Sequence, residues 1–174
     1  DKDAHVGDPA FVDVPLDRLL STDHAAELAQ RITAGERAHV DRMAGEPPDT
    51  THVCVVDAHG NAMSMTHSLG MPSGVVTEGL GFMYNGCMGV FDPRPGRPGS
   101  LAPGKRRFTS LCPTLLLDRG LPDGEALRFV VGAPGGTQIA MGVLQVILNA
   151  VDLDMPVLEA ISAPRFSATS DAID

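Results

Sequence analysis

The sequence predicts an α+β fold in which antiparallel strand pairs pack against helices. Three observations favour it: a helical pattern near the start, two β-prone segments that each turn back on themselves, and two helical patterns after them. The chain has 174 residues, enough for one domain with a buried core. No internal repeat is visible.

The first element is expected at residues 15–34, where side chains recur with helical spacing. These residues are Leu16, Leu19, Leu20, His24, Leu28 and Ile32. Ser21 and Asp23 can break this helix or cap a second one, so the segment predicts one helix or two. Residues 34–49 are polar and contain two glycines and two prolines, which predicts an exposed connection with a boundary near Asp49.

A β-hairpin is expected next. Val53 and Val55 lie in its first strand and residues 62–66 in its second, on either side of the turn sequence Ala-His-Gly-Asn at 58–61. Glycine and proline then recur at short intervals through residues 70–107, which predicts long loops in place of regular core elements. Loops on a rigid scaffold often carry functional residues.

A second hairpin and two helices complete the expected order. Residues 113–118 and 127–131 are β-prone and are joined by a turn-forming segment. Residues 137–151 predict a helix, and residues 157–161 predict a shorter helix that ends before Pro164. The apolar side chains that define the longer helix are Ile139, Val143, Val146, Ile147 and Ala150.

Composition excludes several classes of protein. Hydrophobic residues make up 43% of the chain and the formal net charge is −9, so we expect neither nucleic acid nor anionic lipid as a partner. No apolar run approaches the roughly 18 residues of a membrane span, and the first residues do not resemble a signal peptide. Three widely spaced cysteines are typical of free thiols and favour a reducing compartment, the cytoplasm.

Residues 99–106 almost match the phosphate-binding loop GxxxxGK[ST]. However, Arg106 stands where the loop needs a hydroxyl for Mg²⁺, and the proline-rich residues before it cannot form a core strand. We therefore expect no nucleotide site.

A zinc site is the next alternative, because imidazole and thiolate are the usual zinc ligands. The candidates around the first hairpin are His52, His59, His67 and Cys54. Their spacing matches no standard zinc module, so we expect ordinary surface or packing roles. We expect no metal and no organic cofactor.

Two short features can each be interpreted in two ways. Gly135 and Gly136 precede the longer helix, so their N–H groups could stabilise an oxyanion, but such a turn also needs glycine for its conformation. Thr50 is an ordinary residue for a strand start. If the Asp49–Thr50 bond were cleaved, Thr50 would carry a nucleophilic hydroxyl and an α-amine with a pKa of about 8, a usable base.

Five stretches of the sequence match one family in its order. They are Gly7-Asp-Pro-Ala-Phe-Val-Asp-Val-Pro15, Thr50-Thr-His-Val-Cys-Val-Val-Asp57 with Gly60-Asn-Ala62, Ala102-Pro-Gly-Lys-Arg106, Gly132-Ala-Pro-Gly-Gly136 and Ala163-Pro-Arg-Phe166. Together they resemble the γ-glutamyltranspeptidase family of N-terminal-nucleophile (Ntn) hydrolases. The combination is specific, although each stretch alone is not.

This resemblance implies a four-layer αββα sandwich, of which the chain supplies a part. It also implies a precursor that cuts itself before Thr50. Residues 1–49 would then end the large subunit and residues 50–174 would begin the small, catalytic subunit of one Ntn-hydrolase domain. The implied partners are the rest of the large subunit and a small-molecule acyl substrate, and homo-oligomerisation stays open.

The resemblance assigns catalytic roles residue by residue. Thr50 would be the nucleophile, and its freed α-amine would be the base. Ser68 matches a hydroxyl that hydrogen-bonds the nucleophile, and Thr66 lies one strand period before it on the same face. Gly135 and Gly136 match the pair that stabilises the oxyanion.

The substrate pocket departs from the family pattern. Thr109 and Ser110 match a hydroxyl pair that lines the pocket. Family members hold a γ-glutamyl group with an Asn, a Gln or Glu, and an Asp, whereas these positions are Gly70, Cys87 and Val90 here. Losing partners for a buried charge costs roughly a few kcal/mol of recognition.

The leading hypothesis is therefore an autoprocessed Ntn hydrolase with intact nucleophile machinery and an acyl pocket altered from γ-glutamyl. One alternative is the family branch in antibiotic biosynthesis that hydrolyses a carbon–carbon bond next to a carbonyl. A second alternative is an inactive binding or structural homologue.

Overall fold

The computed structural model describes residues 1–39, 49–121 and 124–167. These residues form two compact units. The first unit takes its described residues from Asp1–Asp41 and Cys87–Thr109, and the second unit from Arg42–Gly86 and Ser110–Asp174. Most of the connection expected at residues 34–49 lies outside the described residues.

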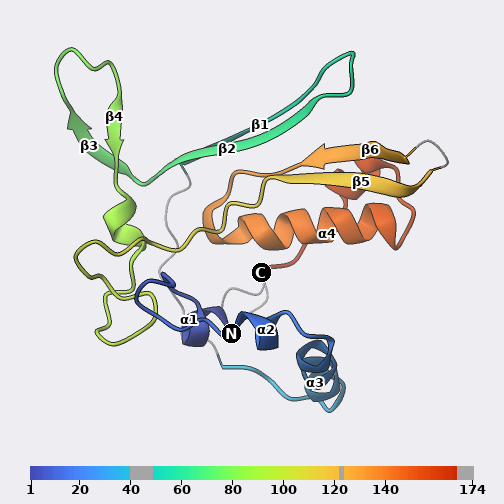
Figure 1. Ribbon diagram of the computed structural model, residues 1–174, viewed down its shortest axis with the longest axis horizontal. Coiled ribbons are helices and arrows are strands. Elements are labelled where there is room, and N and C mark those ends of the chain that lie inside the picture. Colours follow the sequence, from blue (N-terminus) through green and yellow to red (C-terminus); the bar gives the residue numbers. More distant parts are fainter. Residues whose placement is uncertain (40–48, 122–123, 168–174) are drawn as a thin grey trace. The chain divides into compact units, whose positions relative to one another are not determined.

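Short helices make up the regular structure of the first unit (Figure 1). They are α1 (Lys2–His5), α2 (Leu16–Leu19), α3 (Thr22–Thr33) and the 3-10 helix η1 (Cys87–Val90). The Ser21 hydroxyl caps α3 by accepting from the His24 N–H at 3.1 Å. The segment at 15–34 is therefore two helices, as one of the two alternatives predicts.

Ion pairs between arginines and carboxylates join distant parts of the first unit. Asp8 is buried, and its carboxylate accepts from Arg106 N–H and Nη2, both at 2.8 Å, across 98 residues of sequence. Asp92 is also buried and accepts from Arg94 Nη2 at 2.7 Å, and the same guanidinium reaches Asp3 at 3.2 Å. Hydrogen bonds from Arg106 hold the pKa of Asp8 well below its usual range, and those from Arg94 lower the pKa of Asp92 to about 2.

The strands of the second unit form antiparallel pairs. β1 (Asp49–Val56) pairs with β2 (Ala62–Gly70), β3 (Pro72–Val76) with β4 (Met83–Asn85), and β5 (Thr114–Leu121) with β6 (Gly124–Val131). The first and third pairs confirm the two predicted hairpins. The prediction of loops alone at 70–107 was wrong for β3 and β4, because strands of five and three residues are too short to show an alternating pattern.

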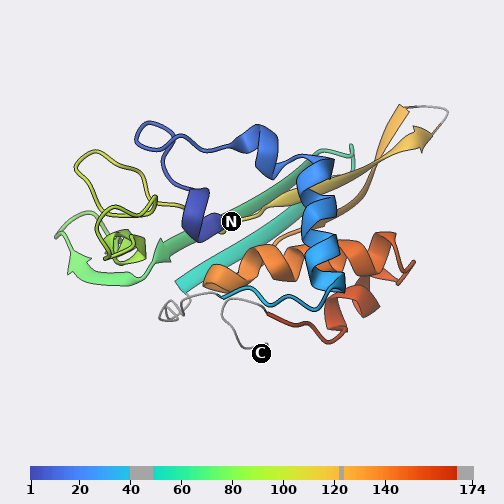
Figure 2. The same cartoon turned by 90° about the horizontal axis from the view of Figure 1, so that it is seen from below.

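The second unit is built in layers. The Ser64 hydroxyl of β2 donates to the Val131 carbonyl at the end of β6, at 3.2 Å, which joins the two long hairpins. α4 (Ile139–Val151) lies along β5–β6, and α5 (Val157–Ser162) packs beside α4 (Figures 1 and 2). The described layers are thus hairpin, hairpin and helices. The mixed α+β class is confirmed, and the complete αββα sandwich remains a prediction.

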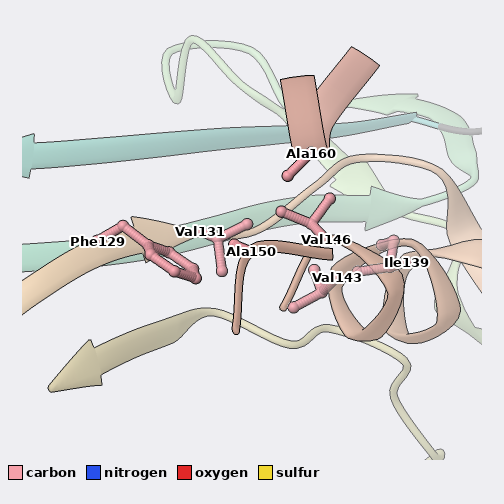
Figure 3. Close-up of a cluster of buried hydrophobic side chains, with 7 residues drawn as sticks. All are labelled: Phe129, Val131, Ile139, Val143, Val146, Ala150 and Ala160. Carbon is pink, nitrogen blue, oxygen red and sulfur yellow. The ribbon is translucent and has the colours of Figure 1, made fainter. Parts of the chain in front are cut away.

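An apolar core lies between α4 and β6 (Figure 3). Ile139 and Val143 of α4 expose only 1% and 2% of their surface. The buried members are Phe129, Val131, Ile139, Val143, Val146, Ala150 and Ala160. Ile147 packs partly buried against this cluster, so the helical pattern in the sequence predicted the buried face of α4 correctly.

Candidate active site

Thr50 is the second residue of β1, where strand pairing is irregular. Thr50 pairs with Ser68 of β2 and Asp49 with Gly70, so Leu69 is an extra residue opposite the Asp49–Thr50 bond. An irregularity of this kind locally disrupts the ladder and changes the direction of side chains. At this irregularity the Asp49 carbonyl lies within hydrogen-bonding distance of the Ser68 hydroxyl.

The Ser68 hydroxyl lies at the centre of this arrangement. It donates to the Asp49 carbonyl at 3.1 Å, accepts from the Gly70 N–H at 2.9 Å, and lies 2.9 Å from Thr50 Oγ1. A serine hydroxyl has one proton to donate and two lone pairs. Because the Ser68 hydroxyl donates its only proton in a hydrogen bond to the Asp49 carbonyl, it must act as the acceptor in its hydrogen bond with the Thr50 hydroxyl. The Thr50 oxygen thereby keeps its own lone pairs for a nucleophilic attack.

Gly135 and Gly136 form the turn between β6 and the helices. Their φ angles are +134° and +59°, which residues with a side chain rarely adopt. Gly136 opens the 3-10 helix η2 (Gly136–Gln138), which runs directly into α4. N–H groups in a first helical turn lack intrahelical acceptors and lie at the positive end of the helix. The turn can therefore offer two N–H donors to an oxyanion.

Ser110 holds this turn in place. Its hydroxyl donates to the Gly136 carbonyl at 2.6 Å. The single proton of Ser110 is therefore used inside the protein, and only its lone pairs remain for another partner. Among the residues expected to line the pocket, Ser110 lies next to the glycine turn.

Thr66 lies one strand period from Ser68 and is engaged by a different residue. His52 is its partner in the register, and His52 Nδ1 lies 2.9 Å from Thr66 Oγ1. The other ring nitrogen, Nε2, lies 3.1 Å from Cys54 Sγ. Sequence reasoning considered His52 only as a zinc ligand or an ordinary packing residue and missed this network. The available signal was the polar alternation of the two strands.

The remaining expected pocket residues are divided between the two units. Gly70 belongs to the second unit, where its N–H bonds Ser68. Cys87, Val90 and Thr109 belong to the first unit. Val90 is buried, Cys87 is half-buried and Thr109 is exposed.

The described residues support neither a zinc cluster nor a phosphate-binding loop. The described residues contain no group of three or more His, Cys, Asp or Glu side chains that could hold a metal ion. Residues 107–113, which follow the rejected phosphate loop, are not helical, and Arg106 binds Asp8. Within the three described ranges, no helix combines the length and apolar character needed to cross a membrane.

A threonine hydroxyl bonded to a serine that also bonds the preceding carbonyl, in a unit of layered strands and helices, is the arrangement expected of an N-terminal-nucleophile hydrolase. Comparison with known proteins agrees with this class. The chain belongs to the gamma-glutamyltranspeptidase family, whose sequence profile matches residues 1–173. This confirms the family resemblance seen in the sequence.

Two curated relatives and one solved structure illustrate the match. The chain is 41% identical to the Acylase ACY 1 proenzyme of Pseudomonas sp. (strain V22), covering 95% of this chain and 29% of that protein. It is 35% identical to the Glutathione hydrolase proenzyme of Pseudomonas sp. (strain A14), covering 95% of this chain and 31% of that protein. A crystal structure of a Helicobacter pylori gamma-glutamyltranspeptidase mutant matches with a TM-score of 0.59 at 36% identity, covering 67% of each chain.

The chain thus spans less than a third of the length of these two curated relatives. Both relatives are named as proenzymes, a term for precursors that mature by processing. The comparisons therefore relate this chain to acylases and to glutathione hydrolases within one family.

Proposed function

We propose that this chain carries the self-cleavage site and the nucleophile of a γ-glutamyltranspeptidase-like Ntn hydrolase. Thr50 acts first on the bond before it and then on an external acyl donor. The observation that supports this most directly is the position of Ser68, which contacts both the Thr50 hydroxyl and the Asp49 carbonyl.

Self-cleavage begins with the uncleaved bond between Asp49 and Thr50, which are consecutive residues of β1. The Thr50 oxygen attacks the Asp49 carbonyl carbon, and the developing oxyanion accepts the hydrogen bond that Ser68 already donates. The proton of the Thr50 hydroxyl passes to the Thr50 nitrogen, the Asp49 C–N bond breaks, and an ester joins the Asp49 carbonyl to the Thr50 oxygen. Water hydrolyses the ester and leaves a free Thr50 with its α-amine.

Acyl transfer uses the same hydroxyl with a new base. The freed α-amine of Thr50 removes the hydroxyl proton, and the oxygen attacks the carbonyl of an amide substrate. The N–H groups of Gly135 and Gly136 stabilise the oxyanion, the protonated amine protonates the leaving amine, and an acyl-enzyme remains. Water or a second amine then removes the acyl group. None of these steps requires a metal or an organic cofactor.

The acyl group is proposed to differ from γ-glutamyl. Gly70, Cys87 and Val90 have no charged or amide side chain with which to hold an α-amine, so a less polar acyl group fits these positions better. The similarity to proteins named acylases supports this preference. Among the described residues, no feature favours the carbon–carbon bond hydrolase alternative.

Cleavage would leave the chain as parts of two subunits. Residues 1–49 end the large subunit and residues 50–174 begin the small subunit of one Ntn domain in this proposal. The first unit contains residues from both sides of the cleavage point, and the Asp8–Arg106 pair joins them.

The experiment that tests self-cleavage uses the complete natural polypeptide that carries this sequence. Mass spectrometry is expected to find a product that begins at Thr50. Thr50→Ala is expected to leave the chain intact, whereas the matched control Thr51→Ala, at an exposed neighbouring position, is expected to cleave as wild type does. An intact wild-type chain would favour the inactive homologue.

A second experiment tests the acyl pocket. The processed enzyme is assayed with γ-glutamyl-p-nitroanilide and with p-nitroanilides of uncharged straight-chain acyl groups. The uncharged donors are expected to react faster. Efficient turnover of the γ-glutamyl compound would show that the pocket is not altered in the proposed way.

A further inference from the structure

The imidazole of His52 lies directly against the backbone of Gly132. A Cβ added to Gly132 would overlap three atoms of this ring, Cε1, Nε2 and Nδ1. Gly132 is not among the residues with a positive φ, so its need for glycine comes from this close approach alone. The ring and the backbone at Gly132 therefore set each other's positions.

The His52 ring is held on its other sides as well. Nδ1 lies 2.9 Å from Thr66 Oγ1, and Nε2 lies 3.1 Å from Cys54 Sγ and 3.4 Å from Ser64 Oγ. All of these partners belong to β1 or β2. Rotation of the ring would break contacts at both nitrogens, so His52 is a fixed surface for Gly132 to pack on.

A second contact fixes the chain one residue earlier. The Ser64 hydroxyl donates to the Val131 carbonyl at 3.2 Å. Val131 and Gly132 end β6 and begin the turn that contains Gly135 and Gly136. The start of the turn that contains Gly135 and Gly136 is thus bonded to the β1–β2 hairpin. The end of this turn is held by Ser110, which donates to the Gly136 carbonyl.

The same hairpin carries the nucleophile. Thr50 pairs with Ser68 and His52 pairs with Thr66, two residues further along the same strands. Such a step is about 6.6 Å along a strand, so His52 lies next to the reacting groups without being one of them. It links the strand of the nucleophile to the turn of the oxyanion donors.

We propose that His52 is a positioning residue that sets the place of the Gly135–Gly136 turn relative to Thr50, by packing on Gly132. This inference rests on the proposed function. Catalytic groups must be held to within about 0.5 Å, and a displacement of about 1 Å can cost roughly 10²-fold in rate. Self-cleavage should depend less on His52, because the Asp49 oxyanion is bonded by Ser68.

A double-mutant cycle in the complete polypeptide tests the proposal. With an acyl p-nitroanilide that wild type hydrolyses, His52→Ala is expected to lower kcat by about 10- to 100-fold with little change in KM. Gly132→Ala alone is expected to be more damaging, because its methyl group meets the ring. In the His52→Ala background the methyl group occupies the space that the ring has vacated. The fold-loss of kcat caused by Gly132→Ala should therefore be at least about ten times smaller there than in wild type.

Two readouts separate the possible failures. Mass spectrometry of the Thr50 terminus is expected to show complete self-cleavage in all four proteins. If His52→Ala does not fold, His52→Asn replaces it, because Asn can still reach Thr66 but lacks Cε1 and Nε2, the two ring atoms nearest to an added methyl group on Gly132. The positioning role would be overturned if Gly132→Ala lowered kcat by the same factor in both backgrounds, or if His52→Ala left kcat unchanged. Either result would leave the proposed function intact. A wild type with neither cleavage nor turnover would overturn both.

Discussion

The two units of the chain are held together by different interactions. Within the described part of the first unit, three of the four buried residues are polar or charged: Asp8, His24 and Asp92, with Val90 as the apolar one. The second unit instead buries seven apolar side chains between α4, α5 and β6. Ion pairs order the first unit, whereas a close-packed core orders the second. The proposed nucleophile lies in the unit with the apolar core, a suitable support for hydroxyls that must be held accurately.

The units also differ in their relation to the proposed cleavage point. The bond between Asp49 and Thr50 lies in the second unit, but the first unit is assembled from chain on both sides of it. Asp3 and Asp8 come before the cleavage point, and their partners Arg94 and Arg106 come after it. After the proposed cleavage, these ion pairs would become contacts between two polypeptides.

The largest expected effect on stability comes from the core of the second unit. Ile139→Ala should lower the free energy of unfolding by about 2–5 kcal/mol, because Ile139 is 1% exposed and its removal leaves a cavity. Urea unfolding of the uncleaved Thr50→Ala protein measures this. The matched control is Leu158→Ala in α5, which is 77% exposed and should change stability by less than about 0.5 kcal/mol. Similar losses in both variants would contradict the assigned core.

The next effect should be confined to the first unit. Arg106→Ala removes the guanidinium that donates to the buried Asp8 carboxylate and keeps only the backbone N–H of residue 106, so residues 1–39 should lose protection from amide hydrogen exchange several-fold or more. Peptides from α4 should keep their protection from amide hydrogen exchange. The control is Arg18→Ala, which removes the same charge from an exposed position of this unit. Equal responses to the two substitutions would mean that charge alone, not the pair with Asp8, orders the unit.

The elements that sequence predicts well are those built from local signals. The Ser21 cap acts within three residues, and the buried face of α4 follows from the spacing of Ile139 and Val143. Both hairpins were visible for the same reason. β3 and β4 were missed, because a strand of three residues has too few positions to show a period.

The contacts that sequence does not predict join residues far apart in the chain. The Asp8–Arg106 pair spans 98 residues, and no local pattern selects one arginine among several as the partner. The contact of His52 with Gly132 depends on how two hairpins stack. The hydrogen bond between Thr50 and Ser68 could be predicted from the sequence only because the family resemblance supplied the roles of these two residues. Their shared contact with Asp49 appears in the structure alone.

Acid should destabilise the first unit before the second, and by less than the substitutions do. Because their arginine partners lower the pKa values of Asp8 and Asp92, the unfolded chain binds more protons than the folded chain in acid. This stabilisation is full above the unfolded pKa of about 3.9 and falls as the pH drops toward the folded pKa of Asp92, about 2. Hydrogen exchange, corrected for its intrinsic rate, should show residues 1–39 losing protection between these pH values before α4 does. If both units lost their hydrogen-exchange protection at the same pH, the proposed difference between an ion-paired first unit and an apolar second unit would be contradicted.

The smallest expected effect concerns Gly70, one of the residues expected to line the acyl pocket. Gly70 has φ +70°, a conformation that Asn tolerates better than other residues with a side chain, so Gly70→Asn should fold. It would add one amide for a γ-glutamyl group, while Cys87 and Val90 in the first unit would remain unable to bind an ammonium. Turnover of γ-glutamyl-p-nitroanilide should therefore rise by only about tenfold or less, the effect of roughly one hydrogen bond to a charged group. Gly70→Ala, with at least as much backbone strain and no amide, should not raise this turnover. A rise in both variants would mean that backbone conformation, and not a missing amide, limits recognition at this position.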